Sequence, residues 1–304
     1  LAYLMQGVAD RLIRWGFNYS LSLSAATVVF LGVFLGFTVG LGPLVWRQLS
    51  GLIREAPAMV AAVQSEVAGI VERYPTMIEQ APIDQLMTTL QGQAASFGQA
   101  VLGFGLSSIP GLLTFAIYMV LIPLMVFFFL KDRDVIVRWA LSFLPDNRPQ
   151  LNEIGRAMNI QIANYVRGKG IEITIIGAVS YAAFASFGLN YTALLALLVG
   201  LSVIVPYIGA FLVTIPVVLV ALFQFGLTGD FYWVVGLYML IQVLDGNVLV
   251  PLLFSEAVDL HPVAIIIAVL IFGGLWGVWG VFFAIPLATL CNVLLLSWPR
   301  AKPA

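Results

Sequence analysis

Long stretches without charged residues constrain the fold of this chain more than any other feature of its sequence. No Asp, Glu, Lys or Arg occurs in 15–46, 85–130, 173–229 or 260–299. A helix that crosses a bilayer needs about 20 apolar residues. Each stretch is therefore long enough to cross once, and the last two are long enough to cross more than once. The apolar residues run continuously, which argues against the alternating pattern of a β-barrel.

The composition excludes several classes of protein. Apolar residues make up 61% of the 304 residues and charged residues 10%, against about 25% charged in soluble domains. Lys and Arg (14) nearly balance Asp and Glu (15), so no basic surface for nucleic acid is expected. The single cysteine, Cys291, excludes a disulfide framework. HExxH, GxSxG and P-loop motifs are absent, and we expect no enzyme, cofactor or metal site. The predicted fold class is an all-α, polytopic membrane protein.

Basic residues predict the topology. Half of all Lys and Arg lie in 131–169, which places this stretch in the cytoplasm by the positive-inside rule. The expected regions are N-terminal membrane spans in 1–46, the first incomplete, a periplasmic insert of amphipathic helices in 47–105, and a span in 106–130. They continue with cytoplasmic amphipathic helices in 131–169 and a transport core in 170–298.

The two soluble regions carry no ligand-type cluster. In the insert, Pro57, Pro75 and Pro82 stand where helices are expected to start. We interpret the insert as a packing or subunit-contact domain. The basic residues of 131–169 are interpreted as topology determinants and lipid-headgroup anchors.

The expected transport core repeats one pattern. A span at 171–188 precedes an apolar stretch at 191–225, and a span at 231–254 precedes a second stretch at 262–298. Each stretch is too long for a single span, so we expect it to fold back near its middle. Residues assigned to the two breaks are Pro206, Tyr207, Gly209 and Pro216, and Gly273, Gly274, Gly277, Gly280 and Pro286.

The charge distribution orients the two units in opposite directions. Inverted repeats with broken helices in matching places are typical of secondary transporters that bind solute at the breaks. The alternative is that Pro and Gly only kink packed helices.

Polar residues inside the apolar segments are candidates for a solute or ion path. Asp245 lies within the span at 231–254, with Gln242 and Asn247 nearby. A carboxylate at mid-membrane usually faces a cavity or a partner. The alternative places Asp245 near the inner interface, where water reaches it.

Five further residues near the second break are weaker candidates for this path. One interpretation of His261 is a gate or proton acceptor that acts with Glu256 and Asp259. The alternative is that His261 caps a helix. Trp276 and Trp279 stand at the second break, where they line a solute cavity or only pack.

The first span carries a small-residue ridge. Gly32, Gly36 and Gly40 are spaced as GxxxGxxxG. This spacing allows close helix packing, within the chain or between subunits.

Four runs of the chain are distinctive: FFFLKDRD, PYIGAFLVTIP, LDGNVLVPLLFSEAVDLHP and IFGGLWGVWGVFFAIPLATL. They resemble the bacterial autoinducer-2 exporter superfamily of permeases, and most closely its PerM-like branch. The resemblance covers about 105–298 with specific motifs and the first hundred residues more loosely. Matching motif residues are Pro206, Tyr207, Gly209, Asp245, Asn247, Pro251, His261, Pro262, Gly273, Gly274, Gly277, Gly280 and Pro286.

The resemblance implies an inner-membrane transporter with a periplasmic helical insert that forms a homo-oligomer, with pentamers known in the superfamily. Members are linked to export of a quorum-sensing furanone and to sodium/proton exchange. We therefore expect a secondary transporter that exports a small polar solute such as an autoinducer, coupled to protons or ions. Expected partners are membrane lipid, the solute, and sodium or protons. The alternatives are a sodium/proton antiporter, a passive oligomeric channel and a non-transporting scaffold.

Overall fold

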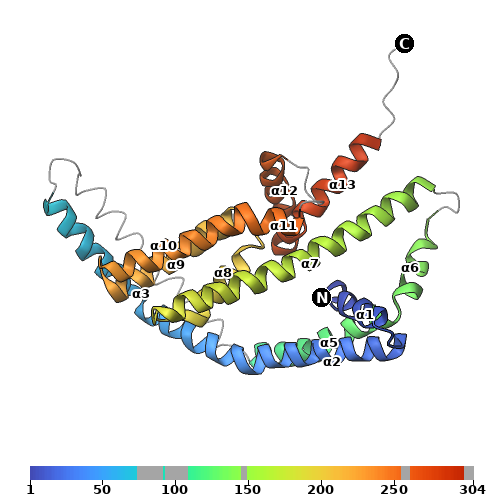
Figure 1. The fold of residues 1–304 in the computed structure, drawn as a ribbon, viewed down its shortest axis with the longest axis horizontal. Coiled ribbons are helices and arrows are strands. Elements are labelled where there is room, and N and C mark those ends of the chain that lie inside the picture. Colours follow the sequence, from blue (N-terminus) through green and yellow to red (C-terminus); the bar gives the residue numbers. More distant parts are fainter. Residues whose placement is uncertain (74–91, 93–108, 145–148, 255–260, 298–304) are drawn as a thin grey trace, which may run out of the picture.

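The computed structural model describes residues 1–73, 92, 109–144, 149–254 and 261–297. Every regular element within these residues is a helix, so the all-α prediction is confirmed. Four of the described helices are long and apolar enough to cross a membrane. Figure 1 shows that most of the helices run along the long axis of the molecule.

The N-terminal arm is a helical hairpin that leads into a very long helix. Helix α1 (Ala2–Arg14) turns at Gly16, whose φ of +91° is a conformation that favours glycine, and α2 (Tyr19–Leu35) follows. A π-helical segment (Gly36–Leu41) joins α2 to α3 (Gly42–Arg73) without a break in the chain direction. Helix α3 therefore continues past residue 46, the predicted boundary between the N-terminal membrane spans and the insert.

One expectation for this arm is wrong. Pro57 lies inside α3 and does not start a helix. Packing explains this, because Met59, two residues further on, is only 2% exposed and joins the main core, which holds the helix together across the proline. The other two prolines of the predicted insert fall outside the described residues. The GxxxGxxxG ridge is exposed, and among the described residues no atom of another segment lies within 4 Å of a Cβ added at any of its glycines. Close packing of this ridge stays a prediction.

The middle of the chain forms three helices. Helix α5 (Ile109–Lys131) corresponds to the span predicted at 106–130, and α6 (Arg133–Leu141) is short. Helix α7 (Pro149–Ser186) then runs unbroken. It joins the predicted cytoplasmic stretch to the predicted span at 171–188, so Lys169 sits within one continuous helix.

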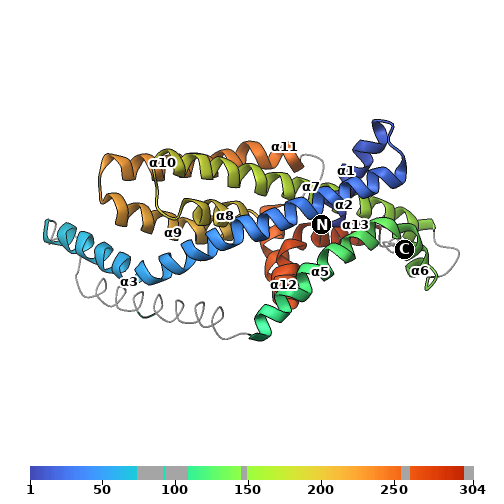
Figure 2. The ribbon, with the colours of Figure 1, turned by 90° about the horizontal axis from the view of Figure 1, so that it is seen from below.

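The next segment packs against α7. Helices α8 (Thr192–Ser202) and α9 (Ile208–Phe225) come from the first long apolar stretch and are joined by a short turn. Helix α10 (Gly229–Leu244) continues through a π-helical segment (Asp245–Leu249) into α11 (Val250–Phe254). Figure 2 shows α8 and α9 beneath α7 and α10.

The second long apolar stretch forms α12 (Pro262–Phe282) and α13 (Ala284–Ser297). Gly277 interrupts α12, with φ of +60° and ψ of −139°. Both long stretches therefore contain a sharp change of direction, as expected from their length.

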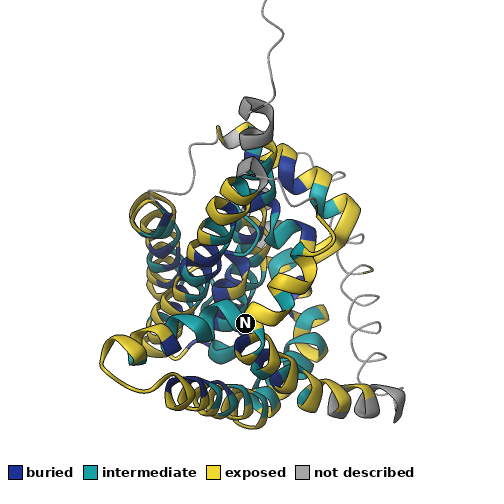
Figure 3. Cartoon of the chain, turned by 90° about the vertical axis from the view of Figure 1, so that its right-hand side faces the viewer, coloured by how far each residue is buried: buried dark blue, intermediate teal, exposed yellow. Residues whose placement is uncertain are grey.

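The main core lies between α7, α8, α9 and α10, while the outer faces of the helices are apolar and exposed (Figure 3). Val28 on α2 is 66% exposed and Val278 on α12 is 77% exposed. Soluble monomers rarely leave such apolar surface in contact with water. Side chains that are fully buried in the core include Phe184, Leu195, Val199, Val217 and Tyr238.

Candidate functional site

A cavity of about 590 Å³ lies between α7, the turn that joins α8 to α9, and the π-helical segment after α10. Apolar side chains form most of its wall. Its polar lining consists of Tyr165, Lys169, Glu172, Ser202, Tyr207, Gln242 and Asp245.

Helix α7 contributes one polar face to the cavity. Tyr165, Lys169 and Glu172 are spaced four and then three residues apart, which places them on the same side of a helix. The Lys169 and Glu172 side chains are 6% and 1% exposed and form an ion pair, with Nζ and Oε2 2.8 Å apart. Burying both charges requires close pairing, because an unpaired charge in such surroundings is very costly.

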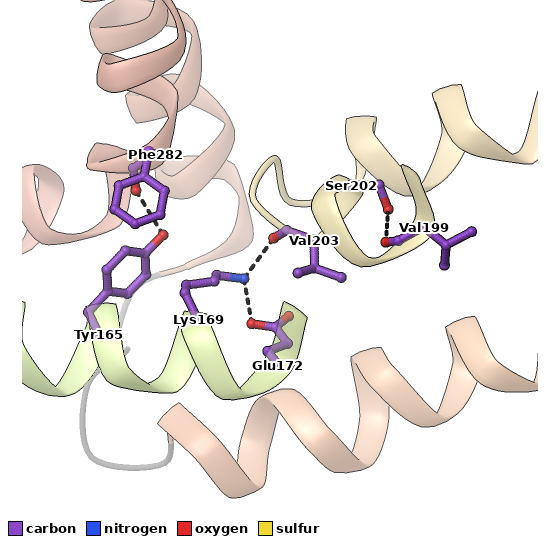
Figure 4. Close-up of polar contacts among 7 residues, drawn as sticks. All are labelled: Tyr165, Lys169, Glu172, Val199, Ser202, Val203 and Phe282. Atoms are coloured by element: carbon purple, nitrogen blue, oxygen red, sulfur yellow. Dashed lines mark hydrogen bonds and ion pairs between the residues drawn. The ribbon is translucent and has the colours of Figure 1, made fainter. Parts of the chain in front are cut away.

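Lys169 also connects α7 to the turn between α8 and α9 (Figure 4). Its ammonium group donates a hydrogen bond of 2.8 Å to the carbonyl oxygen of Val203, the residue directly after α8. The ring of Phe254 lies 5.2 Å from the same nitrogen and adds a cation–π contact. A single side chain thus contacts α7, the turn and α11.

Tyr165 makes the corresponding link to the second break. Its hydroxyl group donates a 2.8 Å hydrogen bond to the carbonyl oxygen of Phe282, at the end of α12. Its ring packs against Phe254 and Phe282. Lys169 and Tyr165, one helical turn apart on α7, therefore each bind a backbone carbonyl near one of the two breaks.

The turn between α8 and α9 is strained and very close-packed. Tyr207 has φ of +63°, which is rare for a residue with a side chain. A Cβ added to Gly209 would lie 1.9 Å from the carbonyl oxygen of Ser202, so only glycine fits there. Pro206, Tyr207 and Gly209 belong to this turn as predicted, whereas Pro216 lies inside α9.

The second break repeats this arrangement. Gly277 has the positive φ, and a Cβ on Gly280 would lie 1.8 Å from the carbonyl oxygen of Phe272. Gly273 is also close-packed, with Val281 at 2.8 Å from its added Cβ, but Gly274 has open space around it. Pro286, also assigned to this break, lies in α13.

Asp245 begins the π-helical segment and lines the cavity together with Gln242. π-Helical segments occur frequently at functional sites. The Oδ1 atom of Asp245 is buried and has no hydrogen-bond partner among the described residues. With Lys169 and Glu172 paired, Asp245 leaves the cavity with an excess of one negative charge when all three groups are ionised.

The other predicted residues of the solute or ion path that the structure describes do not line this cavity. Asn247 is exposed and donates to the carbonyl oxygen of Val243 in its own helix. His261 caps α12, where its Nδ1 accepts a hydrogen bond from Val263 N–H, in agreement with the simpler alternative. Trp276 and Trp279 are 59% and 72% exposed. Glu256 and Asp259 lie outside the described residues.

The α7 face of the cavity is not among the sites predicted from sequence. Tyr165 carries no prediction, and Lys169 belongs to the basic residues interpreted as anchors for lipid headgroups. The structure corrects this interpretation, because Lys169 is buried. A detectable signal was the opposite charges of Lys169 and Glu172, three residues apart directly before the longest uncharged stretch.

Comparison with known proteins identifies the family. The sequence profile of the AI-2E family transporters matches residues 1–300. The chain belongs to the AI-2E transporter family. A protein named as a permease, PerM of Escherichia coli (strain K12), is 47% identical over 304 residues, which are 100% of this chain and 86% of PerM.

A second protein is similar to this chain at lower sequence identity. A protein named as a transport protein, YrrI of Bacillus subtilis (strain 168), is 25% identical over 307 residues, covering 99% of this chain and 85% of YrrI. The family and the apolar helices together make this chain a multi-pass membrane protein of a transporter family rather than an enzyme.

Proposed function

We propose that this chain is a secondary transporter that moves a small polar solute, coupled to a proton or another cation, through the cavity between α7, α9 and α10. The observation that carries the proposal is the Asp245 carboxylate, which faces the cavity with one buried oxygen unpartnered. Ionisable side chains within the bilayer cost free energy, and they usually belong to a transport path.

The excess negative charge favours a cation or proton as one of the transported species. Lys169 already neutralises Glu172 at 2.8 Å, so a proton or a cation such as sodium compensates Asp245. This charge count also supports a second candidate function, sodium/proton antiport, in which the two cations compete for Asp245. For the solute itself, the resemblance to the autoinducer-2 exporter superfamily supports a small polar molecule such as an autoinducer, exported from the cell.

The two breaks support a mechanism of alternating access. Each has a residue with positive φ followed, two or three positions later, by a glycine pressed against an earlier carbonyl group. We infer that the two units are inverted repeats and that they move against a scaffold formed by α2 and α5. Non-helical backbone at membrane depth is tolerated where it is buried in protein or lines a wet cavity.

The topology and assembly that we propose follow from charge and exposure. The concentration of basic residues in 131–169 favours a cytoplasmic position for this stretch and a bacterial inner-membrane location. The insert at 47–105 is then periplasmic and the C-terminus cytoplasmic. The exposed ridge of Gly32, Gly36 and Gly40 offers a contact between subunits of a homo-oligomer, with a pentamer proposed from the family resemblance.

Transport by purified protein in liposomes tests the proposal. Under an imposed pH gradient, we expect Asp245→Asn to lower the rate of proton-coupled solute or sodium flux at least tenfold. Asp230→Asn is the matched control, since Asp230 is an exposed carboxylate in the first turn of the same helix, and its flux is expected to stay within twofold of wild type.

Other outcomes favour the rival functions. A flux that rises linearly with solute concentration and is unaffected by Asp245→Asn indicates a passive channel. A scaffold is indicated by two results together. The purified protein transports no tested solute or cation, and deletion of the insert has the same effect on the cell as deletion of the whole protein.

A further inference from the structure

A second hollow of the structure lies away from the transport cavity, where α1 crosses α7. Two glycines make the crossing close. A Cβ on Gly7 would lie 3.1 Å from Nε of Arg167, and a Cβ on Gly170 would lie 2.8 Å from Cδ2 of Leu4. A groove of about 630 Å³ runs beside this crossing.

One part of the groove wall is apolar. It is formed by Leu4, Met5, Val8 and Leu12 of α1 and by Ile171 and Ile175 of α7. Ile171 is 48% exposed and Ile175 39% exposed. Exposed apolar side chains in a groove of a membrane protein are suited to contact with an acyl chain.

The groove also contains two guanidinium groups. Arg167 is held in place, because its Nε donates a 3.3 Å hydrogen bond to the carbonyl oxygen of Tyr3 and its Nη2 lies 3.6 Å from Asp10 Oδ2. Arg11 is exposed and forms no ion pair with any described residue. Asp10 offsets one of the two charges, so the groove keeps an excess of one positive charge.

Trp15 indicates the level of the groove in the membrane. It lines the groove directly after α1 and is 69% exposed. Tryptophan with this exposure, next to arginine and just before a membrane span, is typical of the level of lipid headgroups. The arginines therefore lie where phosphate groups of lipids are found, and the apolar wall lies next to them.

We propose that this groove binds an anionic phospholipid, with the phosphate on Arg11 and Arg167 and an acyl chain along the apolar wall. Charge complementarity selects the occupant. A guanidinium group can bind two phosphate oxygens at once, through two parallel hydrogen bonds. The net positive charge of the groove also favours phosphatidylglycerol over phosphatidylcholine, because it repels the ammonium group of phosphatidylcholine.

Fluorescence quenching by lipids with brominated acyl chains tests the site. The protein is reconstituted in phosphatidylcholine nanodiscs, and the signal of Trp15 is taken as the difference from a Trp15→Phe variant. We expect brominated phosphatidylglycerol to quench Trp15 at a mole fraction about tenfold lower than brominated phosphatidylcholine does. Equal quenching by the two lipids overturns the proposal.

A matched pair of variants separates a site from general attraction of charge. Arg11→Gln is expected to lower the preference for phosphatidylglycerol about fivefold. Arg138→Gln removes an exposed basic residue of α6 outside the groove. This variant is expected to change the preference for phosphatidylglycerol less than twofold. Equal losses in the two variants would show diffuse attraction and overturn the proposal, as would displacement of the lipid by soluble glycerol phosphate, which would identify a site for free phosphate.

Discussion

Lys169 and Glu172 lie one turn apart on α7 and form an ion pair of 2.8 Å at the wall of the cavity between α7, α9 and α10, with their side chains 6% and 1% exposed. Lys169 also donates to Val203, so the pair is part of the contact between α7 and the turn that follows α8. The position of this turn, and with it the shape of the cavity, thus depends on a buried charge.

Replacing Lys169 with methionine is expected to destabilise the protein by about 3–5 kcal/mol. The cause is the Glu172 carboxylate, which is left buried without its partner. The measurement is reversible unfolding in mixed micelles with increasing denaturing detergent. The double variant Lys169→Met/Glu172→Leu should recover most of the lost free energy, because no unpaired charge remains. A double variant as unstable as the single one would contradict this explanation.

Removing the hydroxyl group of Tyr165 tests the link to the second break. Tyr165→Phe keeps the ring contacts with Phe254 and Phe282 but loses the hydrogen bond to the Phe282 carbonyl group. We expect a loss of about 1 kcal/mol in unfolding free energy, measured in the same assay. Tyr181→Phe is the control, because Tyr181 lies on the same helix and is 51% exposed, and it should change stability by less than a third of that amount.

Alanine at the two close-packed glycines should be strongly disruptive. At Gly209 and Gly280 the new Cβ meets a backbone carbonyl group at less than 2 Å, and main-chain atoms have to move. We expect each variant to lose at least 2 kcal/mol of stability or to fail to accumulate as folded protein, assayed by size-exclusion chromatography. Gly274→Ala is the matched control in an open position. A Gly280→Ala variant as stable as Gly274→Ala would show that the chain does not turn as described.

Substitution of His261 should spare transport. His261→Ala removes an exposed capping interaction at Val263 N–H, worth about 0.5–1 kcal/mol. Because His261 does not line the cavity, we expect the transport rate to stay within twofold of wild type across pH 6–8, in contrast to Asp245→Asn. A pH dependence that disappears in His261→Ala would instead assign the coupling proton to His261.

Part of the site could be predicted from sequence because an isolated carboxylate in an apolar segment is conspicuous. Asp245 and Gln242 were placed on the path, and both line the cavity. Tyr165, Lys169 and Glu172 were not predicted because they lie within or directly after the basic stretch at 131–169, where polar residues are ordinary. Among the described residues, no other segment lies within 4 Å of a Cβ added to the predicted glycine ridge, since glycine spacing alone does not determine which surface packs against it.

The sequence by itself determined the class of fold: long uncharged stretches have to be membrane helices, and two of them are too long to cross only once. Only the tertiary structure decided which polar groups meet, because α7 brings Lys169 to Val203 across 34 positions of sequence and into the lining of the same cavity as Asp245. Helical periodicity places residues on a face of their own helix. The neighbour of that face is set by packing between helices, which local sequence does not encode.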